Sequence, residues 1–431
     1  MSAGLVVFGS FAVLLFLGVP IALSLGMASV ITLLYENLPL SIIPANLYSS
    51  TGKFVLLAIP FFILGGNIME KSGISSRLID FAKTLVGHKK SGMAMVCVIV
   101  ACFFAAISGS GPATVAALGM IIIPAMTQVG YDKASSTALM STAGAIGIVI
   151  PPSITFVIYG SITGNSVGQL FAAGLVPGIL MGVVLVVAMK FVSRKLEIET
   201  IPKATGAERW AAFKDAFWGI MMPVIILGGI YGGIFTPTEA AAVAALYGLL
   251  VGFFIYKTLK LQDLMTILKD SVSQTAVVMF IVGTASLFSW VLTVTGVASA
   301  ASNTLITMVG GNKILFLLVV NIILLIAGCF IDANSAMYII LPILYPVATA
   351  LGIDPVHLGA IMVLNMAIGL VTPPVGINLY TGCGIANISL KEISKAVLPF
   401  VFASLLVLIL VTYVPAVSTW LPSLNFELIE I

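Results

Sequence analysis

Long apolar runs, separated by short polar breaks, recur along the whole chain. Most of these runs are long enough to cross about 30 Å of hydrocarbon as a helix, so the pattern is typical of a membrane protein with many helices. The runs predict crossings at residues 4–19, 21–36, 54–69, 135–165, 168–191, 217–235, 239–256, 274–294, 357–388 and 396–421, and two re-entrant helical hairpins at residues 92–128 and 314–350.

The composition agrees with this pattern. Hydrophobic residues make up 60% of the 431 positions and charged residues only 8%, and the mean hydropathy is +1.20. A soluble domain typically has about a quarter of its residues charged. The longest polar stretch, residues 193–215, predicts a loop rather than a separate soluble domain. The sequence therefore predicts an all-α polytopic membrane protein.

The distribution of basic residues predicts the orientation of the helices. With the loop 193–216 in the cytoplasm, the predicted topology places 17 of the 19 lysines and arginines on the cytoplasmic side, and only Lys53 and Lys313 on the other side. Such an excess of cytoplasmic Lys and Arg is general among helical membrane proteins. We therefore expect a multi-pass protein of a bacterial inner membrane, with this loop in the cytoplasm.

An internal repeat divides the chain into two halves. Residues 110–165 align with residues 332–387 without a gap, at an offset of 222, and 15 of the 56 aligned pairs are identical. Many identical pairs are glycines or prolines, which mark backbone geometry rather than general hydrophobicity. Because each copy contains five crossings and one re-entrant hairpin, the second copy should enter the membrane from the opposite side, as in the inverted repeats of many secondary transporters.

The repeat also sets the expected domains. These are a first inverted repeat (1–192), a cytoplasmic loop (193–216) and a second inverted repeat (217–431), each repeat containing scaffold helices, a hairpin (92–128 or 314–350) and a broken helix (135–165 or 357–388). A duplicated membrane scaffold without transport activity is the alternative interpretation. Paired helix breaks at corresponding positions favour a transporter with a binding site near the middle of the membrane.

A pair of prolines interrupts one helix in each repeat, at Pro151–Pro152 and at Pro373–Pro374. A proline removes the N–H that would bond the carbonyl four residues earlier. An unpaired carbonyl in hydrocarbon costs several kcal/mol unless it meets protein, water or a cation, so the breaks predict oxygen ligands for sodium, although a simple kink is the alternative. The carbonyls expected to be freed are those of Gly147, Ile148, Gly369 and Leu370, and the residues before the prolines, Ile150 and Thr372, are further candidates.

The turns of the two predicted hairpins are candidate binding elements. The first turn, residues 105–114, is rich in serine and glycine, and the second, residues 328–335, contains Asp332. The helix after each turn presents free N–H groups and a positive dipole end, and two such ends can hold an anion without a buried Arg or Lys.

Asp332 is the charged residue that the prediction places deep in the membrane. An acid at that depth is a functional candidate, and it would hold hydroxyls or an amine of the substrate. An N-cap for the following helix is the structural alternative. The full set of candidate substrate-binding residues is Ser110, Ser153, Thr155, Asp332, Asn334 and Asn378.

Four segments of the chain are more distinctive than its hydropathy: residues 107–117 (ISGSGPATVAA), 147–153 (GIVIPPS), 232–240 (GGIFTPTEA) and 369–378 (GLVTPPVGIN). Through these segments, and over essentially its whole length, the chain resembles the large membrane subunit of tripartite ATP-independent periplasmic (TRAP) transporters. The resemblance implies a sodium-driven importer of organic acid anions. It also implies similarity to elevator transporters of the ion transporter superfamily, in which a hairpin-bearing domain slides against a scaffold.

The resemblance also implies partners and ion sites. The expected partners are a separate small four-helix membrane subunit and a soluble periplasmic substrate-binding protein, with no nucleic acid. Two or more sodium ions are the expected coupling ions, without another cofactor. By position, the implied first sodium site consists of Ser108, Gly147, Ile150 and Pro152 with a carbonyl near Ala105, and the second of Gly328, Gly369, Thr372 and Val375. Family substrates include C4-dicarboxylates, sialic acid and other sugar or keto acids, and we expect sialic acid.

Other functions stay open at this point. A standalone sodium/anion symporter with related hairpins would need no binding protein. An intramembrane enzyme is disfavoured, because His88 and His357 show no paired-ligand spacing and Ser108 and Ser110 have no nearby histidine base. A channel fits paired broken helices less well than alternating access does.

Overall fold

The computed structural model describes residues 2–424, and all regular secondary structure in that part of the chain is helical. Within these residues, eight helices are long and apolar enough to cross a membrane, or nine if the bent pair Leu390–Ala396 and Leu398–Tyr413 forms one span. The all-α polytopic architecture predicted from the hydropathy pattern is therefore confirmed.

The first half of the chain begins with helices that the apolar runs predict and adds two that they do not. The unpredicted helices α3 and α5 are short, and α5 buries only one face, through Ile74, Leu78 and Ile79. The helices are α1 (Ala3–Phe16), α2 (Ile21–Tyr35), α3 (Ile42–Thr51), η1 (Phe54–Leu57), α4 (Ala58–Lys71), α5 (Ile74–Val86), α6 (Gly92–Ser108), α7 (Gly111–Gln128), α8 (Lys133–Ala145), η2 (Ile146–Ile148), α9 (Ile154–Thr163), α10 (Val167–Val192) and η3 (Ser193–Lys195).

The second half of the chain contains the remaining helices. Its helices are α11 (Gly206–Tyr231), α12 (Pro237–Leu250), η4 (Val251–Ile255), α13 (Leu261–Val294), α14 (Val297–Val309), α15 (Lys313–Phe330), α16 (Ala333–Ala350), α17 (Pro355–Gly369), α18 (Ile377–Ala386), α19 (Leu390–Ala396), α20 (Leu398–Tyr413) and α21 (Ala416–Ser423).

Helix boundaries follow the internal repeat closely. The helices α7 and α16 are both 18 residues long and begin 222 positions apart, at residues 111 and 333. The helices α5 and α14 are both 13 residues long, and each follows a glycine with positive φ, Gly73 (φ 70°) and Gly296 (φ 73°). Helices 135–165 and 357–388 are each interrupted at the proline pair, as predicted, into α8 and α9 and into α17 and α18.

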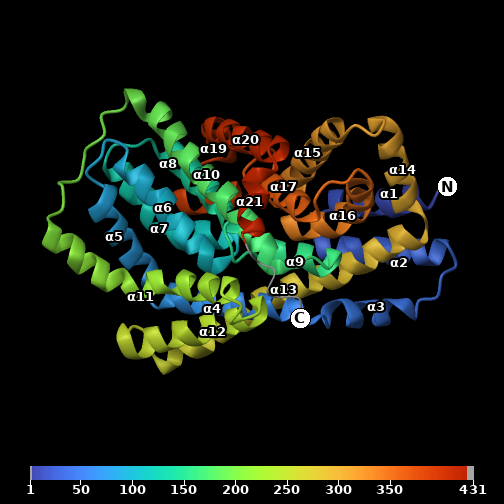
Figure 1. Ribbon diagram of the computed structural model, residues 1–431, viewed down its shortest axis with the longest axis horizontal. Coiled ribbons are helices and arrows are strands. Elements are labelled where there is room, and N and C mark those ends of the chain that lie inside the picture. Colours follow the sequence, from blue (N-terminus) through green and yellow to red (C-terminus); the bar gives the residue numbers. More distant parts are fainter. Residues whose placement is uncertain (1, 425–431) are drawn as a thin grey trace.

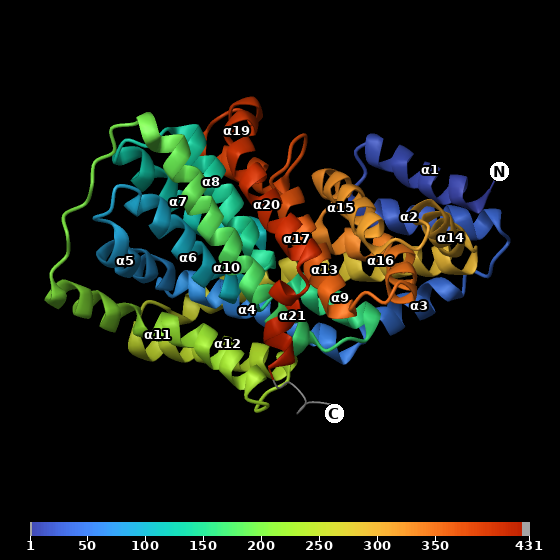
Figure 2. The same cartoon turned by 45° about the horizontal axis from the view of Figure 1, so that its top comes forward.

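The two helical hairpins lie toward opposite ends of the molecule. In Figures 1 and 2, α6 and α7 lie toward one end and α15 and α16 toward the other, with α9 and α17 between them. Each helix that follows a proline break packs against the hairpin of the other repeat, α9 against α16 and α18 against α7. The two halves of the chain therefore contact each other at their helix breaks.

The loop predicted at residues 193–216 is shorter than expected, because α11 already begins at Gly206. Thr205 and Glu208 form a capping box, in which the Thr205 hydroxyl accepts from the Glu208 N–H and the Glu208 carboxylate accepts from the Thr205 N–H. This reciprocal pairing satisfies two N–H groups at the helix start. The prediction of a loop is therefore wrong for residues 206–216.

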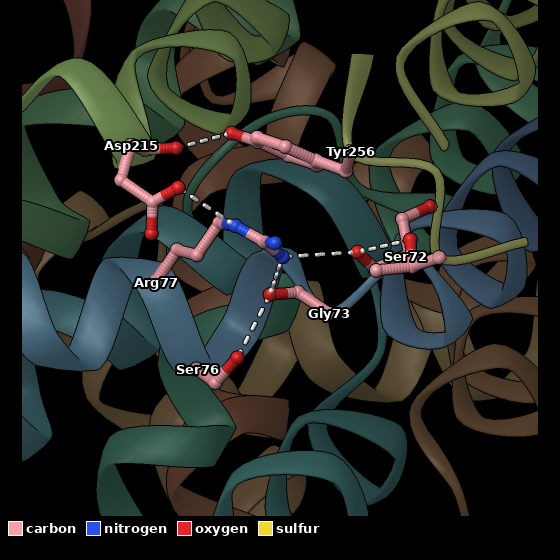
Figure 3. A network of polar contacts seen from close by, with 7 residues as sticks. Ser72, Gly73, Ser76, Arg77, Asp215 and Tyr256 are labelled. Atoms are coloured by element: carbon pink, nitrogen blue, oxygen red, sulfur yellow. Dashed lines mark hydrogen bonds and ion pairs between the residues drawn. The ribbon is translucent and has the colours of Figure 1, made fainter. Parts of the chain in front are cut away.

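A polar network holds the α4–α5 junction against α11 and the segment after η4 (Figure 3). The Arg77 guanidinium donates to Asp215 Oδ1 at 3.1 Å and to the carbonyls of Ser72 and Gly73 at 3.3 and 3.0 Å. It also lies over the ring of Tyr256, 3.9 Å from the centroid, and the Tyr256 hydroxyl donates to the Asp215 carbonyl. One arginine thus ties together three elements from both halves of the chain.

Candidate functional site

The tip of the first hairpin is a cluster of oxygen atoms at the start of α7. The Thr114 hydroxyl donates to the Ser110 carbonyl at 2.8 Å and lies 2.9 Å from the Ser108 hydroxyl. Gly109 ends α6 with φ 59°, and a Cβ on it would lie 2.9 Å from the Pro152 carbonyl oxygen. Only glycine suits both the positive φ and the close approach, so the tip is seated on the first helix break.

The first helix break meets this tip through Gly147. A Cβ on Gly147 would lie 3.0 Å from the Thr114 hydroxyl and 3.1 Å from the Ser110 carbonyl oxygen. Ser153, which caps α9 and is fully buried, donates its hydroxyl to the Ile148 carbonyl at 2.6 Å. Thr114 thus links the predicted residues Ser108 and Gly147. The Ile148 carbonyl has lost its helical N–H partner to Pro152, as predicted, and accepts a side-chain hydrogen bond instead.

The second helix break meets the second hairpin through a glycine pair. A Cβ on Gly369 would lie 2.5 Å from the Cα of Gly328, so α15 and α17 approach each other backbone to backbone. The Gly369 carbonyl accepts from the Thr372 N–H at 3.0 Å, and the Leu370 carbonyl accepts from the Asn378 N–H at 3.1 Å. As predicted, neither carbonyl has the helical N–H partner four residues on, where Pro373 and Pro374 stand. Each accepts a hydrogen bond from another residue instead, Thr372 just before the proline pair and Asn378 just after it.

Asp332 is the N-cap of α16. Its Oδ2 accepts from the N–H groups of Asn334 and Ser335 at 3.0 and 3.1 Å, and its Oδ1 accepts from the Ser335 hydroxyl. The capping role considered from the sequence is therefore confirmed. A substrate-binding role is a separate property that this geometry permits, since a carboxylate can accept about four hydrogen bonds.

The remaining predicted residues are distributed around the two breaks. The Thr155 hydroxyl donates to Asn334 Oδ1 at 3.2 Å and so joins the first break to the second hairpin. Asn378 is buried and donates to the Ser141 carbonyl at 3.0 Å, next to Gly111 at the start of α7. The Ala105 carbonyl accepts from the Gly109 N–H at 3.1 Å. Ile150 and Pro152 lie in the first break and Val375 in the second.

A cavity of about 310 Å³ lies between the first hairpin tip and two other helices, α4 and α13. Ser108 and Ser110 line it from the tip, and Asn67, Glu70 and Gln274 line it from α4 and α13. The residues that line this cavity do not include Asp332, Asn334, Thr155 or Asn378. Sequence reasoning did not single out Asn67 and Gln274, although both are polar side chains inside or at the edge of predicted apolar crossings.

Comparisons with known proteins give the chain a family context. The model of the family described as "Tripartite ATP-independent periplasmic transporter, DctM component" matches residues 8–417. The chain is 45% identical to the C4-dicarboxylate TRAP transporter large permease protein of Pseudomonas aeruginosa over 401 residues, 93% of this chain and 94% of the relative. It is 42% identical to the protein of the same description from Rhodobacter capsulatus over 438 residues, 98% and 99% of the two chains.

A relative with another substrate is similar over nearly the same length. The sialic acid TRAP transporter large permease protein of Vibrio cholerae is 37% identical over 412 residues, 95% of this chain and 96% of the relative. Among solved structures, the YdaH transporter of Alcanivorax borkumensis superposes with a TM-score of 0.61 over 86% of both chains at 15% identity. At this identity the structural likeness concerns the fold alone.

Proposed function

The chain belongs to the DctM component family of tripartite ATP-independent periplasmic (TRAP) transporters, and from this membership we propose that it imports organic acid anions across the inner membrane by sodium symport. The observation that carries the proposal is the pair of proline-interrupted helices at one sequence offset, each packed against a hairpin tip. Broken helices whose ends face each other near the middle of the membrane are the usual sites for substrate and coupling ions in secondary transporters.

We assign the two sodium sites to the two breaks. Ser108, Gly147 and the carbonyls near Ala105, Ile150 and Pro152 would hold the first ion. Its support is the cluster of hydroxyl and carbonyl oxygens around Ser110. Gly328, Gly369, Thr372 and Val375 would hold the second. The hydrogen bonds found on the Ile148, Gly369 and Leu370 carbonyls do not oppose this role, because a carbonyl oxygen has two lone pairs and can accept a second partner.

The preferred substrate class changes with the comparisons. Sialic acid was the expectation from the sequence, but the relatives named for C4-dicarboxylates are 45% and 42% identical to the chain and a relative named for isethionate is 43% identical, against 37% for the relative named for sialic acid. We therefore propose a small organic acid anion as the substrate, with a C4-dicarboxylate as the first candidate. Asp332 and Asn334 of the second hairpin and Ser110, Ser153, Thr155 and Asn378 around the breaks are the proposed binding residues.

The proposed mechanism is an elevator with two partners. The hairpins and broken helices, related as inverted repeats, would move together against a scaffold that includes α4, α12 and α13, with the segment between α10 and α11 in the cytoplasm. A small four-helix membrane subunit would bind the scaffold, and a periplasmic binding protein would deliver the substrate, as in the TRAP family.

Reconstitution with and without each partner tests this proposal. Proteoliposomes would contain this chain, with or without the small subunit, and would receive labelled succinate or sialic acid, either free or loaded on the cognate binding protein. We expect sodium-driven uptake of succinate only when all three proteins are present. Transport at the full rate by this chain alone, given free substrate, would instead identify a standalone sodium/anion symporter.

A further inference from the structure

Two amide side chains of the scaffold face the first hairpin tip across the cavity. Asn67 of α4 and Gln274 of α13 line the same 310 Å³ space as Ser108 and Ser110 of the tip. The helices α4 and α13 pack against each other, so the two amides belong to one rigid wall. The cavity therefore has a wall from each of the two parts that an elevator motion would separate.

The wall carries neutral amide side chains, each with two N–H groups. Asn67 Nδ2 donates to the Ser271 hydroxyl at 2.8 Å, and that hydroxyl donates to the Ile267 carbonyl at 2.7 Å, which fixes the Asn67 amide in place. Gln274 is exposed, one turn along α13 from Ser271. Among the described residues that line the cavity there are amides and hydroxyls but no lysine or arginine.

Neutral donors suit a site from which an anion must leave. A hydrogen bond to an anion from an ionised donor is roughly twice as strong as one between neutral groups, and a site on a conduction path has to bind weakly enough to release its ligand. Glu70 lines the same cavity, near the α4 terminus that precedes Lys71. An acid there disfavours lasting occupancy by an anion.

Resting on the proposed function, we propose that Asn67 and Gln274 form a release subsite for the carried organic anion on the scaffold. The anion contacts them only when the first hairpin tip lies opposite α4 and α13, as it does in this structure. Movement of the tip away from the scaffold would break the contact. The cavity lies at the end of α4 that carries Glu70 and Lys71, and the predicted topology places Lys71 on the cytoplasmic side. The subsite would therefore govern affinity from the cytoplasmic side and leave affinity from the periplasmic side unchanged.

An exchange assay separates the two sides. The complete three-protein system would be reconstituted with sodium on both sides, and labelled succinate would be delivered from outside by the binding protein. The measured quantities are the internal concentration of unlabelled succinate that gives half-maximal exchange and the external half-saturation for the loaded binding protein. The variants are Gln274→Leu, which removes the donors, and Gln274→Glu, which keeps the shape and adds a negative charge. Gln262→Leu, on the same helix but outside the cavity lining, is the matched control.

We expect Gln274→Leu to raise the internal half-maximal concentration about tenfold, because the anion loses one hydrogen bond. Gln274→Glu should raise it further through repulsion, and Gln262→Leu should leave it at the wild-type value. The external half-saturation of all three variants should stay within about twofold of the wild-type value. Three results would overturn the subsite: an internal half-maximal concentration of Gln274→Leu equal to that of the wild type, an external half-saturation raised as much as the internal value, or wild-type exchange by Gln274→Glu. These results leave the proposed function intact, because the wild type still shows sodium-driven uptake. If the wild type shows no sodium-driven uptake, both the proposed function and the subsite are wrong.

Discussion

The contact between Gly369 and Gly328 allows a sharp test of the second helix break. In Gly369→Ala, the new Cβ would lie 2.5, 2.7 and 2.9 Å from the Cα, carbonyl carbon and carbonyl oxygen of Gly328. Carbon atoms in contact prefer a separation of about 3.5–4.0 Å, so α15 and α17 would have to separate by about 1 Å. The obstructing atoms are backbone atoms, which cannot turn away as a flexible side chain could.

The expected cost follows from this geometry. Insertion of a methyl group into a well-packed core typically costs about 1–3 kcal/mol, and a backbone obstruction places Gly369→Ala at the upper end, about 3 kcal/mol. If the Gly369 carbonyl is a sodium ligand, the same displacement should also weaken sodium binding. A loss of about 3 kcal/mol at that site would raise the half-saturation for sodium about a hundredfold.

The assay is thermal unfolding of the purified protein in detergent, with and without sodium, together with uptake against external sodium concentration. Gly384→Ala is the matched control, because a Cβ on Gly384 has no neighbour within 4 Å. Equal unfolding midpoints for the two variants would show that α15 and α17 do not approach as closely as described. If Gly369→Ala is less stable than the wild type but its uptake depends on sodium concentration in the same way, Gly369 is not a sodium ligand.

Three further substitutions test other parts of the account. Asp332→Asn should raise the substrate half-saturation about tenfold to a hundredfold at saturating sodium, whereas Asp354→Asn, at a cap that accepts from two N–H groups in the same way, should leave it unchanged. Uptake curves of Asp332→Asn equal to those of the wild type would show that Asp332 is only a helix cap. Ser153→Ala should lower the unfolding free energy by about 1–3 kcal/mol, because it leaves a buried carbonyl without its partner, and an unchanged unfolding midpoint would contradict the bond to Ile148. Arg77→Ala should lower the unfolding free energy by about 1.5–3 kcal/mol, because its hydrogen bonds to two carbonyls are lost, whereas Asp215→Ala removes only a largely exposed ion pair and should lower it by less than about 1 kcal/mol. A lower unfolding midpoint for Asp215→Ala than for Arg77→Ala would refute this ranking.

Glycine and proline positions made much of the fold predictable. The proline pairs located both helix breaks, and the offset of 222 predicted that α7 and α16 would match in length and start. These residues report backbone geometry directly, and that is why they succeeded. Hydropathy located most of the long helices but missed α3, α5 and α14, which are too short to cross a membrane.

The site was less predictable, because hydrogen-bond partners depend on how the chain returns after each break. The rule that a proline frees a carbonyl does not predict which donor the carbonyl then meets. In the structure the Ser153 hydroxyl donates to the Ile148 carbonyl and the Asn378 N–H to the Leu370 carbonyl. The cavity was missed for a related reason. Asn67 and Gln274 come from helices far apart in the sequence, and a hydropathy pattern does not tell which face of each helix meets the hairpin tip.

Sodium coupling is the central claim, and the driving ion can be measured directly. The complete three-protein system would be given loaded binding protein under two conditions: an inward sodium gradient with the proton gradient collapsed, and an inward proton gradient with sodium replaced by potassium. The account predicts accumulation of the organic acid against its own gradient in the first condition and none in the second. Undiminished accumulation under the proton gradient alone would contradict it.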